Sequence, residues 1–172
     1  MYVKKYPRNW KVKKGEELTE MDKRVLSFQN RGCLVPQKKL IKTPEQIEGI
    51  RKSGIVKTGV LDYVAEHIKA GMSTLEIDRL VYDYTIAHGG IPAPLNYEGF
   101  PKSVCTSSNE VVCHGIPCEE DILEEGDIIN VDVSTILDGY YSDASRMFVI
   151  GETTPEKQRL VDVAKECLLI GM

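Results

Sequence analysis

The dipeptide Asp138-Gly139 is the strongest local constraint on how this chain folds, because runs of β-branched and aromatic residues lie on both sides of it. Asp-Gly is favoured in two-residue hairpin turns, where both central residues need a positive φ. The pattern therefore predicts a β-hairpin over residues 127–151, in which Leu137 faces Tyr140 across the turn.

This register brings two aspartates together. Asp132 is expected to face Ser145, and Asp143 to face Ser134. Because side chains alternate along a strand, both aspartates emerge on the same face of the hairpin as diagonal neighbours. Diagonal Cβ atoms lie about 7 Å apart, which suits two carboxylates that hold metal ions about 3.5–4 Å apart.

A solvated pair of aspartates on a half-buried hairpin is the simpler alternative. The neighbouring residues argue against it, because both faces of the hairpin are apolar and a strand of that kind belongs inside a covered sheet. One face carries Val131, Val133, Phe148 and Ile150, and the aspartate face carries Ile128, Ile136, Met147 and Val149. Two carboxylates buried together repel unless a proton or a cation neutralises them. The sequence therefore predicts a metal site.

The overall composition is that of a globular protein. The chain has 172 residues, of which 42% are hydrophobic, so it can form a core of ordinary size. It contains no run of about 18 apolar residues that would span a membrane, and its charged N-terminus does not resemble a secretory signal. Five cysteines without regular spacing favour free thiols in a reducing cytosol over disulfides or a structural zinc site.

Charge is unevenly distributed along the chain. Residues 1–40 contain eleven Lys and Arg but four Asp and Glu, a balance of +7, whereas the remaining residues have a balance of −11. Such a basic extension can contact RNA or an acidic partner. The extension lacks aromatic or glycine repeats, which favours the interpretation that it is solvated and contacts neither RNA nor a partner.

Capping signals predict three helices outside the hairpin. The first is expected to begin at Thr43-Pro44 and to end at Gly71, and the second to begin at Ser73. The third is expected to begin at Thr154-Pro155. Residues 106–117 are expected to form two further strands joined by a turn at Ser108-Asn109.

Two long motifs resemble a known family. PLNYEGFPKSVCTSSNEVVCHGIP at residues 94–117, together with INVDVSTILDGYYSDASRMF, is similar to type I methionine aminopeptidases of the pita-bread fold, in metallopeptidase family M24. The resemblance implies an α+β fold, with an antiparallel sheet and covering helices, that forms the N-terminal half of a pseudo-two-fold domain. It also implies a basic extension over residues 1–40 and part of the catalytic domain over residues 41–172, with the C-terminal half absent from this chain.

The resemblance further implies an enzyme that removes the initiator methionine from nascent polypeptides with two divalent metal ions, such as Co, Mn, Fe or Zn. Asp132 and Asp143 match two of the family's five metal ligands, and Asp143 is expected to bridge the ions. The other three ligands, one His and two Glu, are expected outside this chain. The 172 residues alone are therefore expected to hold part of the site and to be inactive.

Four further positions match the family's site, and a fifth residue, Ser134, is a candidate from its place on the hairpin. His114 is expected to contact the substrate and to take part in catalysis without binding metal. Tyr97, Phe100 and Cys105 are expected to line the methionine pocket, where a thiol and aromatic edges suit a thioether. Ser134 shares the aspartate face and is expected to orient Asp132.

Two neighbouring positions call for comment. Glu98 stands where some family members carry a histidine, so the polar contacts at the pocket rim are expected to differ. Cys113 precedes His114, which suggests a thiol protease dyad. Adjacent residues of a strand point to opposite faces, however, so the sequence predicts no such dyad.

The resemblance also implies partners and a location. It implies N-terminal Met peptides of nascent proteins as substrates and the ribosome as a partner. No membrane or DNA contact is expected, and the full-length protein is expected to be a cytoplasmic monomer. Two alternatives remain: a non-catalytic pita-bread protein that binds peptides or ribosomal RNA, and a relative of the X-Pro aminopeptidases.

Overall fold

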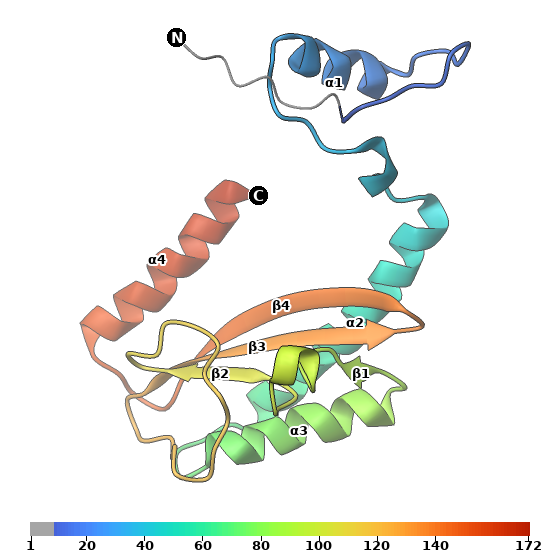
Figure 1. Cartoon of the computed structure of the whole chain (residues 1–172). Coiled ribbons are helices and arrows are strands. Elements are labelled where there is room, and N and C mark those ends of the chain that lie inside the picture. The colour runs from blue at the N-terminus through green and yellow to red at the C-terminus, as the bar shows by residue number, and fades with distance from the viewer. Residues whose placement is uncertain (1–8) are drawn as a thin grey trace. The chain divides into compact units, whose positions relative to one another are not determined.

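The computed structural model describes residues 9–172, which form two compact units divided between Ile47 and Glu48. The larger unit contains the sheet and most of the helices (Figure 1). Within residues 9–172, no helix is long and apolar enough to cross a lipid bilayer. The five cysteines are all free thiols, as predicted.

The smaller unit is built around a buried tryptophan. The indole nitrogen of Trp10 donates a 2.9 Å hydrogen bond to Asp22 on α1 (Glu20–Asn30), and the ammonium group of Lys38, in η1 (Lys38–Leu40), lies 3.1 Å from the same carboxylate. A hydrogen bond from Thr19 and then those from Lys38 and Trp10 hold the pKa of Asp22 well below its ordinary value. Residues 9–40 of the basic extension therefore make contacts within a folded unit, and the absence of contacts with RNA or a partner stays a prediction.

Three helices begin where the capping signals predicted. They are α2 (Pro44–His67), α3 (Thr74–Ala87) and α4 (Pro155–Gly171). Thr43, Ser73 and Thr154 each accept a hydrogen bond from a backbone N–H in the first turn, which satisfies an otherwise unpaired donor. The predicted end of the first helix at Gly71 is wrong. The helix ends at His67, and Gly71 instead forms a turn with a φ of 85°.

The sheet is antiparallel and is centred on β3 (Ile128–Leu137). Along its whole length β3 pairs with β4 (Tyr140–Val149), while its other edge holds β1 (Ile91–Pro92) and β2 (Cys105–Ser108). The predicted hairpin register is confirmed, because Asp132 faces Ser145 and Ser134 faces Asp143. Both turn residues have positive φ, 50° at Asp138 and 80° at Gly139.

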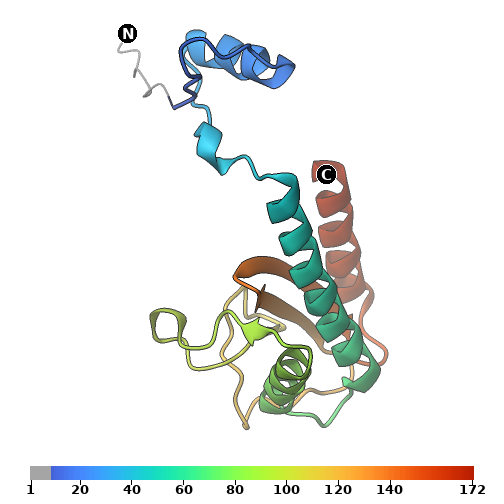
Figure 2. The same cartoon turned by 90° about the vertical axis from the view of Figure 1, so that its right-hand side faces the viewer.

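The hydrophobic core lies between one face of this sheet and two helices. Most of its fully buried side chains come from α2, α3 and β3: Val60, Val64, Ile77, Val81, Ile129, Val131 and Val133. Val104 and Leu123, outside these elements, are fully buried in the same core. Figure 2 shows α2 on one side of the sheet and the loop over residues 93–101 on the other. The aspartate face, which was expected to be covered as well, is only half-buried: Asp132 and Ser134 are partly exposed and Asp143 is exposed.

Polar contacts attach α2 to the hairpin. The hydroxyl of Ser53 lies 3.0 Å from the carbonyl oxygen of Thr135 and 2.8 Å from the hydroxyl of Ser142. Further along, Arg146 of β4 donates to the carbonyl oxygen of Leu61 at 3.2 Å and to Asp62 at 2.8 Å. These contacts bridge about 85 residues of sequence and fix the hairpin against the helix.

The predicted second strand after Ser108 is wrong. Residues 111–116 form turns and loop, because the N–H of Val111 donates back to the carbonyl oxygen of Ser108 and closes a turn. Val112 is 94% exposed, and His114 has a φ of 55°, which no strand residue adopts. A run of β-branched residues here reflects an exposed loop and not a paired strand.

Replacing a core side chain of β3 tests this packing. We expect Ile129→Ala to lower the free energy of unfolding of the larger unit by about 2–5 kcal/mol, because Ile129 is fully buried against α2 and α3. Ile55→Ala, at a site 67% exposed on α2, is the control and should cost less than about 0.5 kcal/mol. Urea unfolding should be followed by circular dichroism, since the one tryptophan, Trp10, lies in the smaller unit.

Candidate metal centre

The two aspartates predicted to share a face open into a cavity of about 850 Å³ in the larger unit. Ser134 and His114 line the same cavity, as do Tyr97, Phe100 and Cys105. The structure therefore brings together all the residues that the sequence singled out for this site. They come from β2, β3, β4 and the loops that flank β2.

Electrostatic repulsion acts between the two carboxylates. Burial raises the pKa of the Asp132 carboxyl above its ordinary value, and the negative charge of Asp143 raises it further. His114 acts in the opposite direction, because a positive charge nearby favours the ionised carboxylate. This corner of the cavity thus disfavours two uncompensated negative charges.

Ser134 contacts a different aspartate from the one expected. Its hydroxyl donates a 2.6 Å hydrogen bond to Oδ1 of Asp143 and not to Asp132. The reason is the register, since Ser134 stands directly opposite Asp143 across the hairpin, and direct cross-strand neighbours are closer than residues two apart on one strand. Ser134 therefore fixes the orientation of Asp143.

His114 reaches the cavity from a loop that lies against β2. The N–H of Thr106 donates to the carbonyl oxygen of Gly115 at 3.0 Å, and the N–H of Gly115 is 3.3 Å from the hydroxyl of Ser107. A Cβ atom at Gly115 would collide with the carbonyl group of Thr106. Only glycine permits this close approach, and the approach places the neighbouring His114 in the cavity.

Cys113 does not line the cavity. Cys113 and His114 lie in a loop and not in a strand, so alternation of side chains along a strand does not separate them. No hydrogen bond between the two side chains is present among the described residues. The conclusion that they form no dyad therefore stands, for a different reason.

Cys105 lies on β2 directly beside Asp132 of β3. Burial raises the pKa of its thiol, and the negative charge of Asp132 adds to this effect. A neutral thiol is a small, polarizable and largely apolar group. Together with the rings of Tyr97 and Phe100, it gives this side of the cavity an apolar surface.

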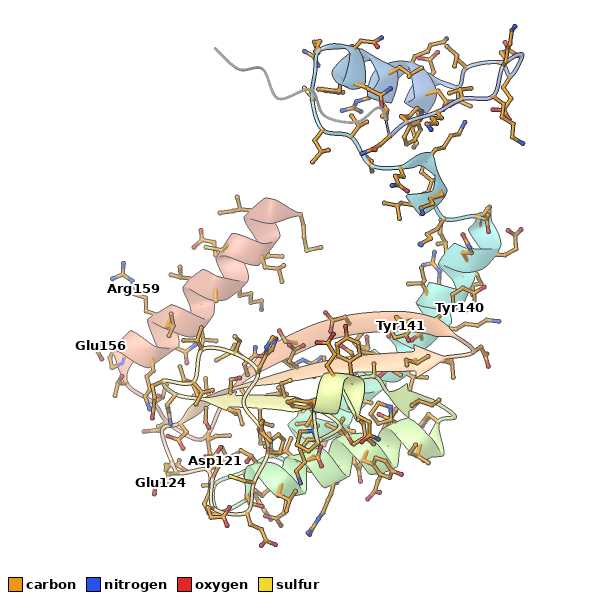
Figure 3. The ribbon with its side chains drawn as sticks, viewed as in Figure 1. Asp121, Glu124, Tyr140, Tyr141, Glu156 and Arg159 are labelled. Atoms are coloured by element: carbon orange, nitrogen blue, oxygen red, sulfur yellow. The ribbon has the colours of Figure 1, made fainter. Side chains whose placement is uncertain are left out.

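Sequence reasoning missed Tyr141 and Ile116, which also line the cavity. Tyr141 lies two residues before Asp143 in β4, so strand alternation alone places it on the aspartate face. Tyr140, on the other face, packs against Gly49 of α2. Both tyrosines are labelled in Figure 3. Ile116 lies in the segment that was predicted to be a strand and is a loop, so strand alternation could not place its side chain.

Asp78, another residue that the sequence did not single out, holds the chain that enters β2. It is buried on α3 and accepts a 2.6 Å hydrogen bond from the N–H of Ser103. Burial is the main effect on the pKa of Asp78 and raises it, and the N–H groups of Ser103 and Val104 only partly offset this. Because Cys105 follows directly, Asp78 sets the position of one wall of the cavity.

The carboxylates fit a divalent cation as part of its ligand set. Oxygen donors on a shared face suit such ions, and a cation would relieve the repulsion that raises the pKa of Asp132. Within residues 9–172, however, no group of three or more His, Cys, Asp or Glu side chains is arranged to hold a metal ion.

Comparison with known proteins places the chain in a family. Residues 48–172 match the family described as Metallopeptidase family M24. The chain belongs to this family. Its sheet, cavity and carboxylate pair all lie within the matched residues, and the antiparallel sheet with helices agrees with the predicted α+β pita-bread fold.

Individual relatives of this M24 chain carry informative names. It is 49% identical over 127 residues to "Methionine aminopeptidase A" of Synechocystis, which covers 74% of the chain and 50% of the relative. It is 51% identical to "Methionine aminopeptidase" of Chlamydia trachomatis, covering 75% of the chain and 45% of the relative. The chain thus spans about half the length of the curated relatives it matches.

Solved structures agree on the fold. The methionine aminopeptidase from Rickettsia prowazekii superposes with a TM-score of 0.73 at 42% identity, over 75% of this chain and 52% of that one. An Xaa-Pro dipeptidase from Bacillus anthracis reaches a TM-score of 0.67 at 19% identity, over 88% of this chain and 43% of that one. The second similarity shows the fold alone.

The raised pKa of Asp78 predicts a pH-dependent effect of Asp78→Asn. The folded carboxyl stays protonated to higher pH than the unfolded one, whose ordinary pKa is 3.8. The contribution of Asp78 to the free energy of unfolding therefore falls as the pH rises from about 4 through its folded pKa. The neutral amide of an asparagine does not titrate, so its contribution stays constant. We expect the free energy of unfolding of Asp78→Asn to rise relative to the native chain over this range, measured by urea unfolding at a series of pH values.

The matched control is Asp83→Asn, since Asp83 is exposed on the same helix. Its unfolding free energy should follow that of the native chain at every pH. Asp78→Ala, which leaves the N–H of Ser103 without its acceptor, should lose about 1–3 kcal/mol. An Asp78→Asn curve parallel to the native one would contradict the role of burial at this carboxyl.

Proposed function

We propose that a protein containing this chain and extending over the full length of its relatives, here called the full-length protein, removes N-terminal methionine by metal-dependent hydrolysis. The observation that carries the proposal is the pair Asp132 and Asp143, which share one face of a hairpin inside a cavity that His114 also lines. Relatives named methionine aminopeptidase at 42–51% identity support this choice of reaction.

In this proposal Asp132 and Asp143 are the residues of this chain that would hold the divalent ions. Bound divalent cations supply a water molecule that is nucleophilic at neutral pH, because they lower its pKa by many units. Ser134 keeps the Asp143 carboxylate in one orientation through its 2.6 Å hydrogen bond. The remaining ligands, one His and two Glu by the family resemblance, are proposed to lie along the part of the relatives' length that this chain does not span.

His114 is proposed to act on the substrate and not on the metal. Its loop position beside β2 lets the imidazole donate a hydrogen bond to the scissile carbonyl oxygen as negative charge develops there. A donor that is already in place stabilises the transition state without reorganisation at the moment of reaction. This role explains why a histidine stands next to the carboxylates without joining a group of three donors.

The apolar side of the cavity is proposed to bind the methionine side chain. Tyr97, Phe100 and Cys105 line it, and a thioether makes favourable contacts with aromatic edges. The partly buried thiol of Cys105 has a raised pKa, which keeps a negative charge out of an apolar pocket.

The two alternative functions have less support. A non-catalytic binding protein has no need of paired carboxylates whose charges repel each other. An X-Pro aminopeptidase-like activity is favoured only by relatives at 17–19% identity, a level that speaks for the fold. Nascent peptides as substrates, the ribosome as a partner, a cytoplasmic location, a monomeric state and the absence of membrane or DNA binding remain predictions.

Variants of the full-length protein separate the proposed roles. Asp143→Ala should abolish methionine release from a Met-Ala-Ser peptide and lose metal, because both ions depend on this carboxylate. Asp132→Ala should first weaken metal affinity. His114→Ala should keep its metal yet lose about 10²–10³ in kcat, the effect of removing one transition-state donor. Metal content should be measured by elemental analysis of each purified variant.

Cys113→Ala is the control for His114→Ala, since Cys113 is the adjacent residue but does not line the cavity. It should retain both metal and activity. Loss of metal from His114→Ala would make His114 a ligand and overturn its assignment as a donor to the substrate.

The 172-residue chain by itself should show negligible methionine release and weak metal binding. The described residues hold no group of three metal donors, and α4 has no buried residue, with Leu168 63% and Ile170 79% exposed. Exposed apolar surface of this kind favours association, so the chain should bind the dye ANS more strongly than the full-length protein does. Rapid methionine release by the purified chain with added Co²⁺ or Mn²⁺ would contradict this expectation.

A further inference from the structure

The cavity carries two side chains, Glu98 and Tyr141, that the proposed reaction does not use, and Tyr97 of the proposed methionine pocket precedes Glu98 directly in the chain. Tyr97 and Glu98 reach the cavity from η2 (Tyr97–Gly99), and Tyr141 reaches it from β4 (Figure 3). Tyr97 is 68% exposed and Tyr141 is 64% exposed, whereas Asp132 is half-buried. Asp132 is therefore less accessible than these three side chains, whereas Asp143 is exposed like them.

The backbone that presents Glu98 is in an unusual conformation. Glu98 has a φ of 48°, and the flanking Asn96 and Gly99 have φ values of 66° and 87°. Asparagine and glycine adopt this left-handed region readily, but glutamate does not. Strained residues of this kind occur where the surrounding structure holds a side chain in place for function.

The carboxylate of Glu98 has no charged partner in the described part of the chain. None of the ion pairs found among residues 9–172 involves it. The rings of Tyr97 and Tyr141, which line the same cavity, offer faces that attract cations. A carboxylate and aromatic faces at one opening together favour an ammonium or guanidinium group over a neutral or acidic one.

We propose that Glu98, together with Tyr97 and Tyr141, selects peptides that carry lysine or arginine shortly after their second residue. The residue to be cleaved must lie at Asp132 and Asp143, and in this proposal the residues that follow it pass these three side chains. The inference rests on the proposed function and adds to it a class of preferred substrates.

The test uses the full-length protein loaded with Mn²⁺ and three peptides, Met-Ala-Lys-Ser, Met-Ala-Ala-Ser and Met-Ala-Glu-Ser. At low salt, kcat/KM for the lysine peptide should exceed that for the glutamate peptide roughly 3- to 10-fold. This is the size expected when one exposed carboxylate attracts the first peptide and repels the second. Glu98→Gln, which keeps the shape without the charge, should reduce this ratio, and Glu98→Lys should reverse it. High salt should also reduce it, because exposed charges are screened.

A local effect must be separated from the general attraction of cationic peptides, since the residues after 40 carry a balance of −11. Glu119→Gln is the matched control, because it removes the same charge from an exposed position outside the cavity and should leave the ratio at the native value. One outcome is that the alanine peptide is cleaved, but the ratio of kcat/KM for the lysine peptide to that for the glutamate peptide is the same in the native protein and in Glu98→Gln. This outcome would overturn the selectivity and leave the proposed function standing. Failure to cleave any of the three peptides would overturn both.

Discussion

The candidate site depends above all on the register between β3 and β4. A slip of one residue would send the side chain of Asp143 to the opposite face and separate the two carboxylates. The Asp138-Gly139 turn sets the register at one end, because its two positive φ values fit a two-residue loop. The hydroxyl of Ser53 supports it from α2 through its contacts with Thr135 and Ser142.

The same alternation divides the work between the two faces of the hairpin. On one face Ile129, Val131 and Val133 are fully buried against α2 and α3, and their removal from water provides the main driving force for packing. On the other face the intervening residues are free to be polar. The repulsion between Asp132 and Asp143 is tolerated because the hydrophobic face stabilises the strands that hold them.

Local signals in the sequence predicted the hairpin and the helix starts, because both follow from residues next to one another in the chain. Asp-Gly determines a turn, and Thr or Ser followed by Gln or Glu determines a cap. The loop at residues 111–116 has the composition of a strand, but pairing depends on distant partners that composition does not specify. The predicted register places Ser134 directly opposite Asp143. The contact between their side chains could therefore be predicted from the sequence, but only by following every side chain on that face. The link between Asp78 and Ser103 spans 25 residues and has no local signal at all.

Gly115 and His114 are adjacent in the chain, but selection would act on them for different reasons. Any side chain in place of Gly115 would meet the carbonyl group of Thr106, so selection against substitutions here would act through the approach of two backbones. The neighbouring His114 would be retained for the role proposed for its imidazole. If both positions were conserved, sequence alone would not separate the two causes. The three-dimensional contact shows that Gly115 is needed for the close approach of two backbones.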